Sequence, residues 1–281
     1  MYRTILVPVD GSPTSNDALA CAVSLSRATG ATIRAVFVVE PIEYDLAAKD
    51  ASARTAARQR GRETLSSVVG SVTDSGLTVD RDVREGVPYQ EIVALARRGA
   101  DLIVLGTRGS TADTGLGSTI QRVFTTAETP VLAVPPDASL PDDGPRRVLI
   151  ATDGSEIGSL AADHALELAD RVGSAVDVLH VIDETNPALA DPSQPISELA
   201  REGGHDVVES IRAAASERDL SVTTTVMRGV PGTAIRSHAS NADADLIAMG
   251  TRGHATPSGQ LPGGTTARVL GQADRPILLC G

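Results

Sequence analysis

The chain has 281 residues and a formal net charge of −11, from 36 acidic and 25 basic residues. This acidic balance argues against a general nucleic-acid-binding protein, because such binding relies on clustered cations. No stretch approaches the roughly 18 consecutive apolar residues that a membrane span requires, so neither membrane insertion nor secretion is expected. Length alone suggests about two domains.

The cysteine and lysine content narrows the function further. Cys21 and Cys280 have no neighbouring cysteine, which is typical of reduced packing residues in a cytoplasmic protein. Lys49 is the only lysine, and the Gly-Lys-Ser/Thr tripeptide of a phosphate-binding P-loop does not occur. Walker-type ATPase and kinase functions are therefore excluded.

In the first half of the chain, short runs rich in Val, Ile and Leu alternate with longer stretches of helical period. This alternation is typical of βαβ units and predicts a parallel sheet covered on both faces. Ser12 is the expected N-cap of the first helix, with Pro13 at its first position, and Gly30 is expected to end it. The predicted strands are 3–9, 32–39, 77–83, 101–105 and 130–134, and the predicted helices are 13–29, 50–74, 88–99 and 118–127.

The second half repeats the first. The segment Asp10–Ser12 aligns with Asp153–Ser155, and Asp101–Gly109 aligns with Asp245–Gly253. Between the copies lies a segment rich in proline and acidic residues, which disfavours regular structure. The expected organisation is two copies of one domain and a linker, at residues 1–136, 137–145 and 146–281.

Ligands of a doubly wound parallel sheet bind beyond the carboxyl ends of the strands, where the strand order reverses. If the order is 3-2-1-4-5, the first and fourth strands are neighbours at that reversal. The turns that follow them, Asp10–Ser12 and Gly106–Gly109, then meet in one crevice. Glycines let backbone N–H groups approach an anion closely. In each copy the Gly-rich loop leads into the last predicted helix, whose N-terminus favours an anion. The sequence therefore predicts a phosphate-binding crevice in each copy.

Three segments of the first copy resemble a universal stress protein domain, and the second copy resembles another. The segments are Val7–Ser12, Gly86–Pro88 and Gly106-x2-Gly109-x7-Gly117-Ser118. The resemblance covers nearly the whole chain. It implies a tandem α/β protein in which each domain is a doubly wound, five-stranded parallel sheet of order 3-2-1-4-5 flanked by helices. One branch of this family binds ATP through a Gly-x2-Gly-x9-Gly-Ser/Thr motif, and another lacks the motif and binds no nucleotide.

The resemblance implies an adenine nucleotide as the ligand: ATP, or ADP or AMP. With such a ligand, Mg²⁺ is the ion expected to bridge the phosphates, and no metal site made by protein side chains is expected. Asp10 and Asp153 are then expected beside the ribose and adenine, and the backbone near Val39 and Ile182 at the adenine edge. The residues expected to line the ribose and phosphates are Gly106, Gly109, Gly117 and Ser118 in the first copy and Gly250, Gly253 and Gly263 in the second.

Each copy departs from the family pattern. The first has seven residues where the motif has nine, so its loop is short for a triphosphate. The second keeps nine but places Gly264 where the family has Ser or Thr, and the neighbouring Thr265 is the candidate substitute. Arg108 and Arg252 follow each motif's first glycine by two positions and either contact a phosphate or are solvated.

Two residue types have alternative explanations. Asp10 and Asp153 either contact the ligand or hold the following turn through side-chain hydrogen bonds.

All histidines lie in the second copy, and none pairs at metal-ligand spacing. His254 directly follows the Gly-x2-Gly turn and is the histidine expected near a ligand, whereas the other four are expected at the surface or in packing. A hydrolase is not expected, because no Gly-x-Ser-x-Gly elbow exists and the first copy has no histidine base.

The expected function is that of a cytoplasmic stress-response protein that binds ATP as a regulatory ligand and is not an enzyme. Two alternatives remain open: an interaction scaffold with vestigial pockets, and a slow ATPase. The final strands, 130–134 and 276–280, are apolar and expected at sheet edges. The resemblance implies that the two domains form an internal pseudo-dimer through these strands. Pairing of two chains as a homodimer is a separate hypothesis.

Overall fold

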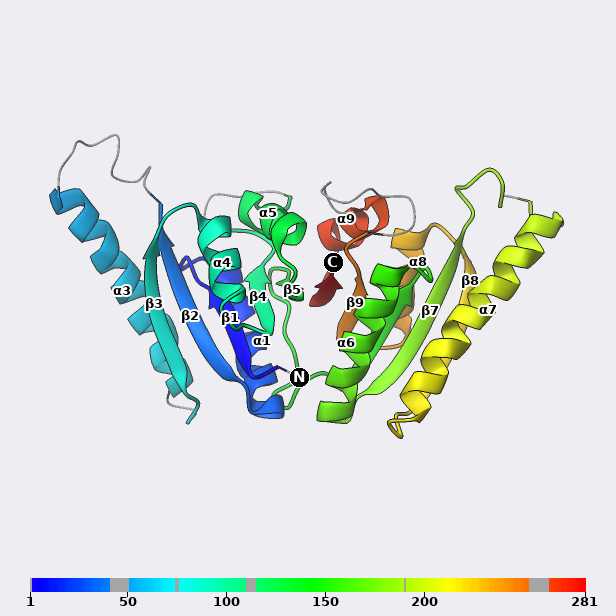
Figure 1. The fold of residues 1–281 in the computed structure, drawn as a ribbon, viewed down its shortest axis with the longest axis horizontal. Helices are drawn as coiled ribbons and strands as arrows, with labels where there is room; N and C mark the ends of the chain where they lie inside the picture. The colour runs from blue at the N-terminus through cyan, green and yellow to red at the C-terminus, as the bar shows by residue number, and fades with distance from the viewer. Residues whose placement is uncertain (1, 41–50, 74–75, 110–114, 190, 253–262) are drawn as a thin grey trace. The chain divides into compact units, whose positions relative to one another are not determined.

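The computed structural model describes residues 2–40, 51–73, 76–109, 115–189, 191–252 and 263–281. The chain divides into two compact units, Met1–Gly144 and Pro145–Gly281, and each is an α/β domain with a parallel sheet (Figure 1). This confirms the predicted fold class.

The first domain alternates strands and helices. Its elements are β1 (Thr4–Pro8), α1 (Pro13–Thr29), β2 (Thr32–Val39), α3 (Ala51–Thr73), β3 (Val79–Glu85), α4 (Pro88–Ala96), β4 (Leu102–Gly106), α5 (Ser118–Thr126) and β5 (Val131–Val134). The strand order is β3-β2-β1-β4-β5, as predicted, and each adjacent pair is parallel. The order therefore reverses between β1 and β4.

The second domain repeats this topology. Its elements are β6 (Arg147–Thr152), α6 (Glu156–Val172), β7 (Ala175–Asp183), α7 (Pro195–Ser216), β8 (Val222–Gly229), α8 (Pro231–Asn241), β9 (Leu246–Gly250), α9 (Gly264–Gly271) and β10 (Ile277–Cys280). The strand order is β8-β7-β6-β9-β10, again with parallel pairs. The reversal now lies between β6 and β9.

Capping chemistry sets the bounds of the helix that follows the first strand of each domain. The Ser12 hydroxyl accepts a hydrogen bond from the Ser15 N–H at 3.2 Å, and Gly30 ends α1 in the left-handed conformation with φ 77°. The Ser155 hydroxyl and Gly173 do the same for α6. These caps were predicted from the sequence, and α1 has the predicted bounds.

Two predicted elements of the first domain have an end that differs from the structure by more than one residue. The third strand was expected at 77–83, but β3 runs from Val79 to Glu85 because it pairs with β2 from Ile33 to Val39. Neighbour pairing, which a local hydrophobic pattern does not reveal, decides this strand's ends. Helix α4 stops at Ala96, ahead of a turn in which Gly99 has φ 123°.

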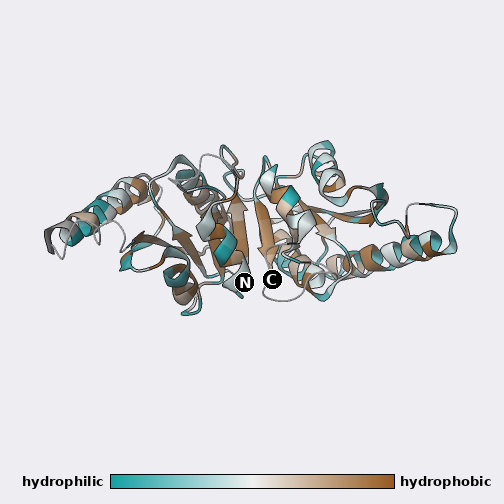
Figure 2. Ribbon diagram, turned by 90° about the horizontal axis from the view of Figure 1, so that it is seen from above, coloured by the Kyte–Doolittle hydropathy of each residue, from teal (hydrophilic) through white to brown (hydrophobic). Residues whose placement is uncertain are grey.

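The core of each domain consists of its central strands and the helix faces packed against them. Figure 2 shows the strands as predominantly hydrophobic and the helices as mixed. Cys21 in α1 and Cys280 in β10 are buried, free thiols, and burial raises the pKa of each to about 12. Both thiols are thus protonated packing groups. Among the described helices, none is long and apolar enough to cross a membrane.

An aspartate fixes the amino-terminal end of the central strand pair in each domain. Asp101, just before β4, accepts hydrogen bonds from the backbone N–H groups of Arg3 and Thr4 at 2.7 and 2.9 Å. Asp245, just before β9, accepts from Arg146 and Arg147 at 2.7 and 3.1 Å. The strands at the order reversal are therefore tied together by side chains as well as by the sheet.

The segment predicted as a linker packs on α1 of the first domain. The Asp137 N–H donates to the Asp17 carboxylate at 3.0 Å, and the Ser24 hydroxyl donates to the Pro141 carbonyl. Ala138 and Leu140 are buried there. The segment has no helix or strand, yet most of it belongs to the first compact unit.

Candidate functional site

The site in each domain begins where the two strands at the order reversal end. In the second domain, β6 ends at Thr152 and β9 ends at Gly250, and these neighbouring strands are parallel. Their carboxyl ends therefore lie at the same edge of the sheet. In the first domain, β1 and β4 bring Asp10 and Gly106 to the corresponding edge.

The aspartate after the first strand of each domain holds the turn that follows it. Oδ1 of Asp10 accepts from the Ser12 N–H at 2.9 Å, and Oδ1 of Asp153 accepts from the N–H and hydroxyl of Ser155 at 3.0 and 2.6 Å. The glycine between them has φ 80° in the first domain and 79° in the second, which favours glycine. Both aspartates are exposed. The turn-holding alternative therefore applies, and it leaves each carboxylate at the crevice.

The glycine that ends the fourth strand packs tightly against the helix that starts nearby. A methyl group added at Gly106 would lie 2.9 Å from the Thr14 carbonyl oxygen. One added at Gly250 would lie 2.9 Å from the Ile157 side chain and 3.0 Å from the Arg252 carbonyl oxygen. A larger residue at either position would require its neighbours to move, so the first glycine of each motif favours close packing.

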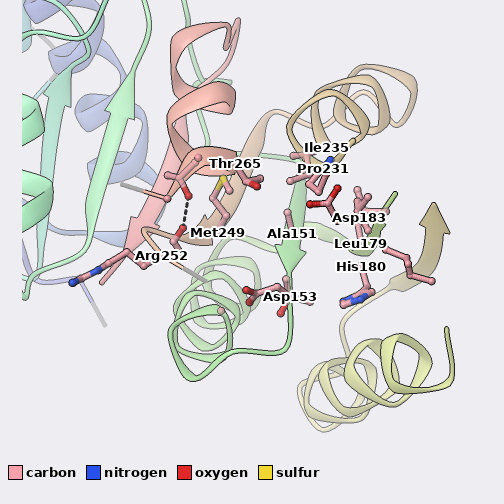
Figure 3. A pocket seen from close by; sticks show the side chains of 18 of the residues that line it. Ala151, Asp153, Leu179, His180, Asp183, Pro231, Ile235, Met249, Arg252 and Thr265 are labelled. Atoms are coloured by element: carbon pink, nitrogen blue, oxygen red, sulfur yellow. Dashed lines mark hydrogen bonds between the residues drawn. The ribbon is translucent and has the colours of Figure 1, made fainter. Parts of the chain in front are cut away.

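In the second domain, these elements surround a cavity of about 460 Å³ (Figure 3). A cavity of this size is typical of small-ligand sites. The residues predicted from the sequence that line it are Asp153, Ile182, Gly250, Arg252, Gly263, Gly264 and Thr265. Two further predicted residues, Gly253 and His254, lie outside the described residues. Every described site residue predicted in the second domain thus borders one cavity.

In the first domain, the structure brings several predicted residues together. A methyl group added at Gly109 would lie 3.1 Å from Oδ2 of Asp10, and one added at Gly117 would lie 3.6 Å from the Gly109 nitrogen. The Gly117 N–H donates to the Thr107 carbonyl at 2.9 Å, which closes the base of the loop.

The other predicted residues of the first domain take the positions that the topology gives them. Ser118 begins α5, and Arg108 lies in the turn after β4. Val39 ends β2, and its carbonyl accepts from the Gly86 N–H at 3.1 Å. Residues 110–114, which contain most of the shortened loop, lie outside the described residues.

The start of α9 forms one end of the second domain's cavity. Gly263 is the N-cap and provides no side-chain hydrogen bond to the first turn. The Thr266 hydroxyl donates to the Gly250 carbonyl at 3.0 Å, whereas Thr265 lines the cavity beside Gly264. Backbone N–H groups at a helix start suit an anionic group, whereas Figure 3 shows the Arg252 side chain directed away from the other labelled lining residues.

Sequence reasoning missed the cavity's apolar wall and one histidine. Leu179, Ile235 and Met249 line the cavity together with His180. We expected His180 at the surface or in packing, but its ring borders the cavity, and Figure 3 shows it near Asp153, across the cavity from Thr265. The alignment of the two halves of the chain marks this position, because His180 replaces Phe37 there in an otherwise apolar strand.

The environment of His180 favours the neutral imidazole. Burial lowers the pKa of His180 below its ordinary value of 6.5, and this effect outweighs the opposing influence of the Thr152 backbone and of the Asp153 charge. Gly204 of α7 packs against the ring, since a methyl group there would lie 2.7 Å from Cδ2. The ring is thus held between α7 and the sheet.

On mild acidification, the free energy of unfolding is expected to fall less in His180→Phe than in wild type. Because the folded state lowers the pKa of His180, the unfolded chain takes up this proton first as the pH falls below about 6.5, which favours unfolding. The contribution of His180 to the change in the free energy of unfolding cannot exceed about 1.4 kcal/mol per pH unit, and solvent screening reduces this contribution. Denaturant titrations across this pH range measure it, with His180→Gln as a second non-titrating variant. Equal pH dependence in wild type and both variants would contradict the assignment.

The described residues show no arrangement for protein-only metal binding. Among them, no group of three or more His, Cys, Asp or Glu side chains is placed to hold a metal ion. The second domain's cavity instead combines an apolar wall, an exposed carboxylate and a helix start. This combination suits a ligand with an apolar ring, hydroxyl donors and an anionic end.

Comparison with known proteins gives a consistent result. A family model described as the universal stress protein family matches residues 1–135 and again 144–281. The chain is 28% identical over 289 aligned residues to a universal stress protein of Mycolicibacterium smegmatis, covering 98% of this chain and 96% of the relative. It is 32% identical over 138 residues to one of Methanocaldococcus jannaschii, covering 48% of this chain and 81% of the relative.

Among solved structures, the crystal structure of a universal stress protein from Archaeoglobus fulgidus has the same fold. The TM-score is 0.77 at 20% sequence identity, and the alignment covers 99% of this chain and 95% of that chain. The likeness thus extends over both domains.

Proposed function

The chain belongs to the universal stress protein family, with two tandem domains, and on that premise we propose that it binds an adenine nucleotide as a regulatory ligand. The proposed site is the cavity of the second domain, with a corresponding site at Asp10 and Gly109 in the first. One observation carries the proposal: every described residue that the sequence assigned to a nucleotide in the second domain lines a single cavity.

Each part of the cavity suits one part of an adenine nucleotide. The adenine ring would lie against Ile235 and Met249, which line the cavity with apolar side chains. The Asp153 carboxylate accepts hydrogen bonds, which is what a ribose diol donates. The phosphate end would face the start of α9, where N–H donors and the helix dipole favour negative charge.

Mg²⁺, where present, would be bound mainly by the nucleotide. The described residues offer no cluster of metal-ligating side chains, so phosphate oxygens and water would fill most of its coordination shell. The protein's part is to position the phosphate through backbone donors at the start of α9. We propose ligand-controlled conformation in the cytoplasm as the role, rather than catalysis, because the lining residues have no evident nucleophile with an adjacent base.

Asp153→Ala is expected to weaken nucleotide binding by roughly 10- to 100-fold in the second domain. The reason is the loss of charge-assisted hydrogen bonds to the ribose, worth about 1.5–3 kcal/mol. Isothermal titration of Mg-ATP into the full chain measures it, alongside Asp10→Ala, which removes the same turn-holding carboxylate from the first domain.

The pattern of loss in these variants tests the proposal. Stepwise loss of binding in the two variants supports two sites, and loss in Asp153→Ala alone supports the second domain only. If wild type releases no heat and gains no thermal stability with nucleotide, the proposal fails in favour of an interaction scaffold.

Association through the final strands remains part of the proposal. β5 and β10 are apolar and lie last in the strand order of their own domains. An apolar strand in that position favours pairing with another strand. We propose that the two domains pair through these strands, which the family resemblance and this apolar character support, and that two chains pair further as a homodimer.

A further inference from the structure

We propose that Asp183 makes the second domain's cavity selective for a base that carries an exocyclic amino group, as adenine does. This inference rests on the proposed function and assigns the side chain that recognises the base. Three observations support it: the place of Asp183 at the end of β7, the hydrogen bonds of one of its carboxylate oxygens, and the apolar surface beside it.

Asp183 lies at the end of the cavity that the adenine ring would occupy. It is the last residue of β7 and pairs with Gly229, the last residue of β8. The chain then enters α8, so Pro231 and Ile235 line the same part of the cavity. Figure 3 shows these two side chains next to Asp183. A flat ring that packs on this apolar surface therefore presents its edge to the Asp183 carboxylate.

One oxygen of this half-buried carboxylate is held in place, and the other is open. Oδ1 accepts hydrogen bonds from the Thr185 N–H and hydroxyl at 2.9 and 2.6 Å. No described residue donates a hydrogen bond to Oδ2 or forms an ion pair with it. The guanidinium of Arg228, on the neighbouring strand β8, instead donates to the Leu189 carbonyl. Thr185 thus fixes the orientation of the carboxylate and leaves Oδ2 to accept from a ligand.

An open carboxylate oxygen favours a donor at the base edge and disfavours an acceptor. An ionised carboxylate has no hydrogen to donate, so the base must present an N–H to it. The amino group of adenine is such a donor. A base without this group leaves the half-buried oxygen without a partner, which costs binding free energy. A site built around a hydrogen bond rejects an analogue that lacks the donor for this reason.

The sequence of the first domain differs at the residue that orients the carboxylate. Glu40 aligns with Asp183, but Ile42 aligns with Thr185 and has no hydroxyl group. The inference therefore concerns the second domain, and its test must report that domain. Asp10→Ala is used as the background for this purpose, because it is expected to weaken the first site.

The test compares ATP with purine riboside 5′-triphosphate, which differs from ATP only in lacking the amino group. Each nucleotide is titrated with magnesium into the full chain, and the heat of binding is measured. We expect ATP to bind at least about tenfold more tightly, as the loss of a hydrogen bond to a charged group predicts.

Two variants of Asp183 test the side chain itself. In Asp183→Asn, the amide oxygen still accepts from Thr185, so the NH₂ group takes the place of Oδ2 and faces the amino group donor to donor. Asp183→Ala removes both oxygens. In each variant the preference for ATP should fall to within about threefold. Glu184→Gln removes a charge one residue outside the lining and should keep the preference of the background. Thermal unfolding checks that each variant is folded.

The outcomes separate this inference from the proposed function. If the two nucleotides bind the background protein equally, Asp183 does not select the base, while nucleotide binding stands. If ATP keeps its preference in a folded Asp183→Asn or Asp183→Ala variant, other groups recognise the amino group and the assignment is overturned. If neither nucleotide binds, the proposed function fails and this inference fails with it.

Discussion

Replacing Gly250 with alanine is expected to lower the free energy of unfolding of the second domain by about 1–3 kcal/mol. The added methyl group would lie 2.9 Å from the Ile157 side chain and 3.0 Å from the Arg252 carbonyl oxygen, both closer than ordinary van der Waals contact. Since the Gly158 nitrogen is also only 3.3 Å away, α6 or β9 must move to relieve the contact. Such movement would also distort the cavity, so nucleotide affinity should fall.

Chemical denaturation of the full chain measures this effect. Gly271→Ala in α9 is the matched control, because a methyl group there meets nothing within 4 Å. The control should be neutral or stabilise by up to about 1 kcal/mol, since alanine favours a helix over glycine. If Gly250→Ala is as stable as wild type, the start of α6 moves at little cost and the close packing at Gly250 contributes little to the free energy of unfolding.

Gly264→Ser is expected to tighten nucleotide binding by roughly tenfold. The first domain has Ser118 at the corresponding position, the first residue of α5, and the ATP-binding pattern of the family has Ser or Thr there. A methyl group at Gly264 meets nothing within 4 Å, so the side chain fits without rearrangement. Its hydroxyl would donate a charge-assisted hydrogen bond to a phosphate, worth about 1.5–3 kcal/mol.

Gly264→Ala isolates the role of this hydroxyl. It adds the same β-carbon without a donor, so its affinity should stay near that of wild type. Titration of a single nucleotide into both variants makes the comparison. Equal affinities for serine and alanine at this position would mean that the phosphate does not lie at the start of α9.

Local chemistry in the sequence predicted the framework of each domain well. Ser12, Pro13 and Gly30 determine the two ends of α1 by capping and backbone conformation, which depend on adjacent residues alone. The third strand was misplaced by two residues at each end, because its bounds follow from pairing with β2 across many intervening residues. Contacts between distant segments are what a single sequence conceals.

The site was predicted unevenly for the same reason. Turn residues such as Asp153 and Gly250 have recognisable patterns and align between the two halves. Leu179 and Met249 have the same apolar character whether they face a core or a cavity, so the sequence did not mark them. His180 was distinguishable only as a polar substitution for Phe37, and its position beside the cavity depends on the way α7 packs over β7.

The hydrogen bonds of Asp101 and Asp245 help to fix the geometry of the proposed ligand site at the opposite end of the sheet. Each carboxylate joins the start of the fourth strand to the start of the first, and in return the Asp101 and Asp245 N–H groups each donate to that strand's backbone at 2.9 Å. A slip of either strand by one residue would break these bonds and turn its side chains to the wrong face. The spacing between the Asp153 turn and Gly250 is therefore set by an anchor some five residues away along both strands, out of reach of the ligand. Substitutions in the binding loops can thus change which ligand is held without changing how far apart the two loops stand.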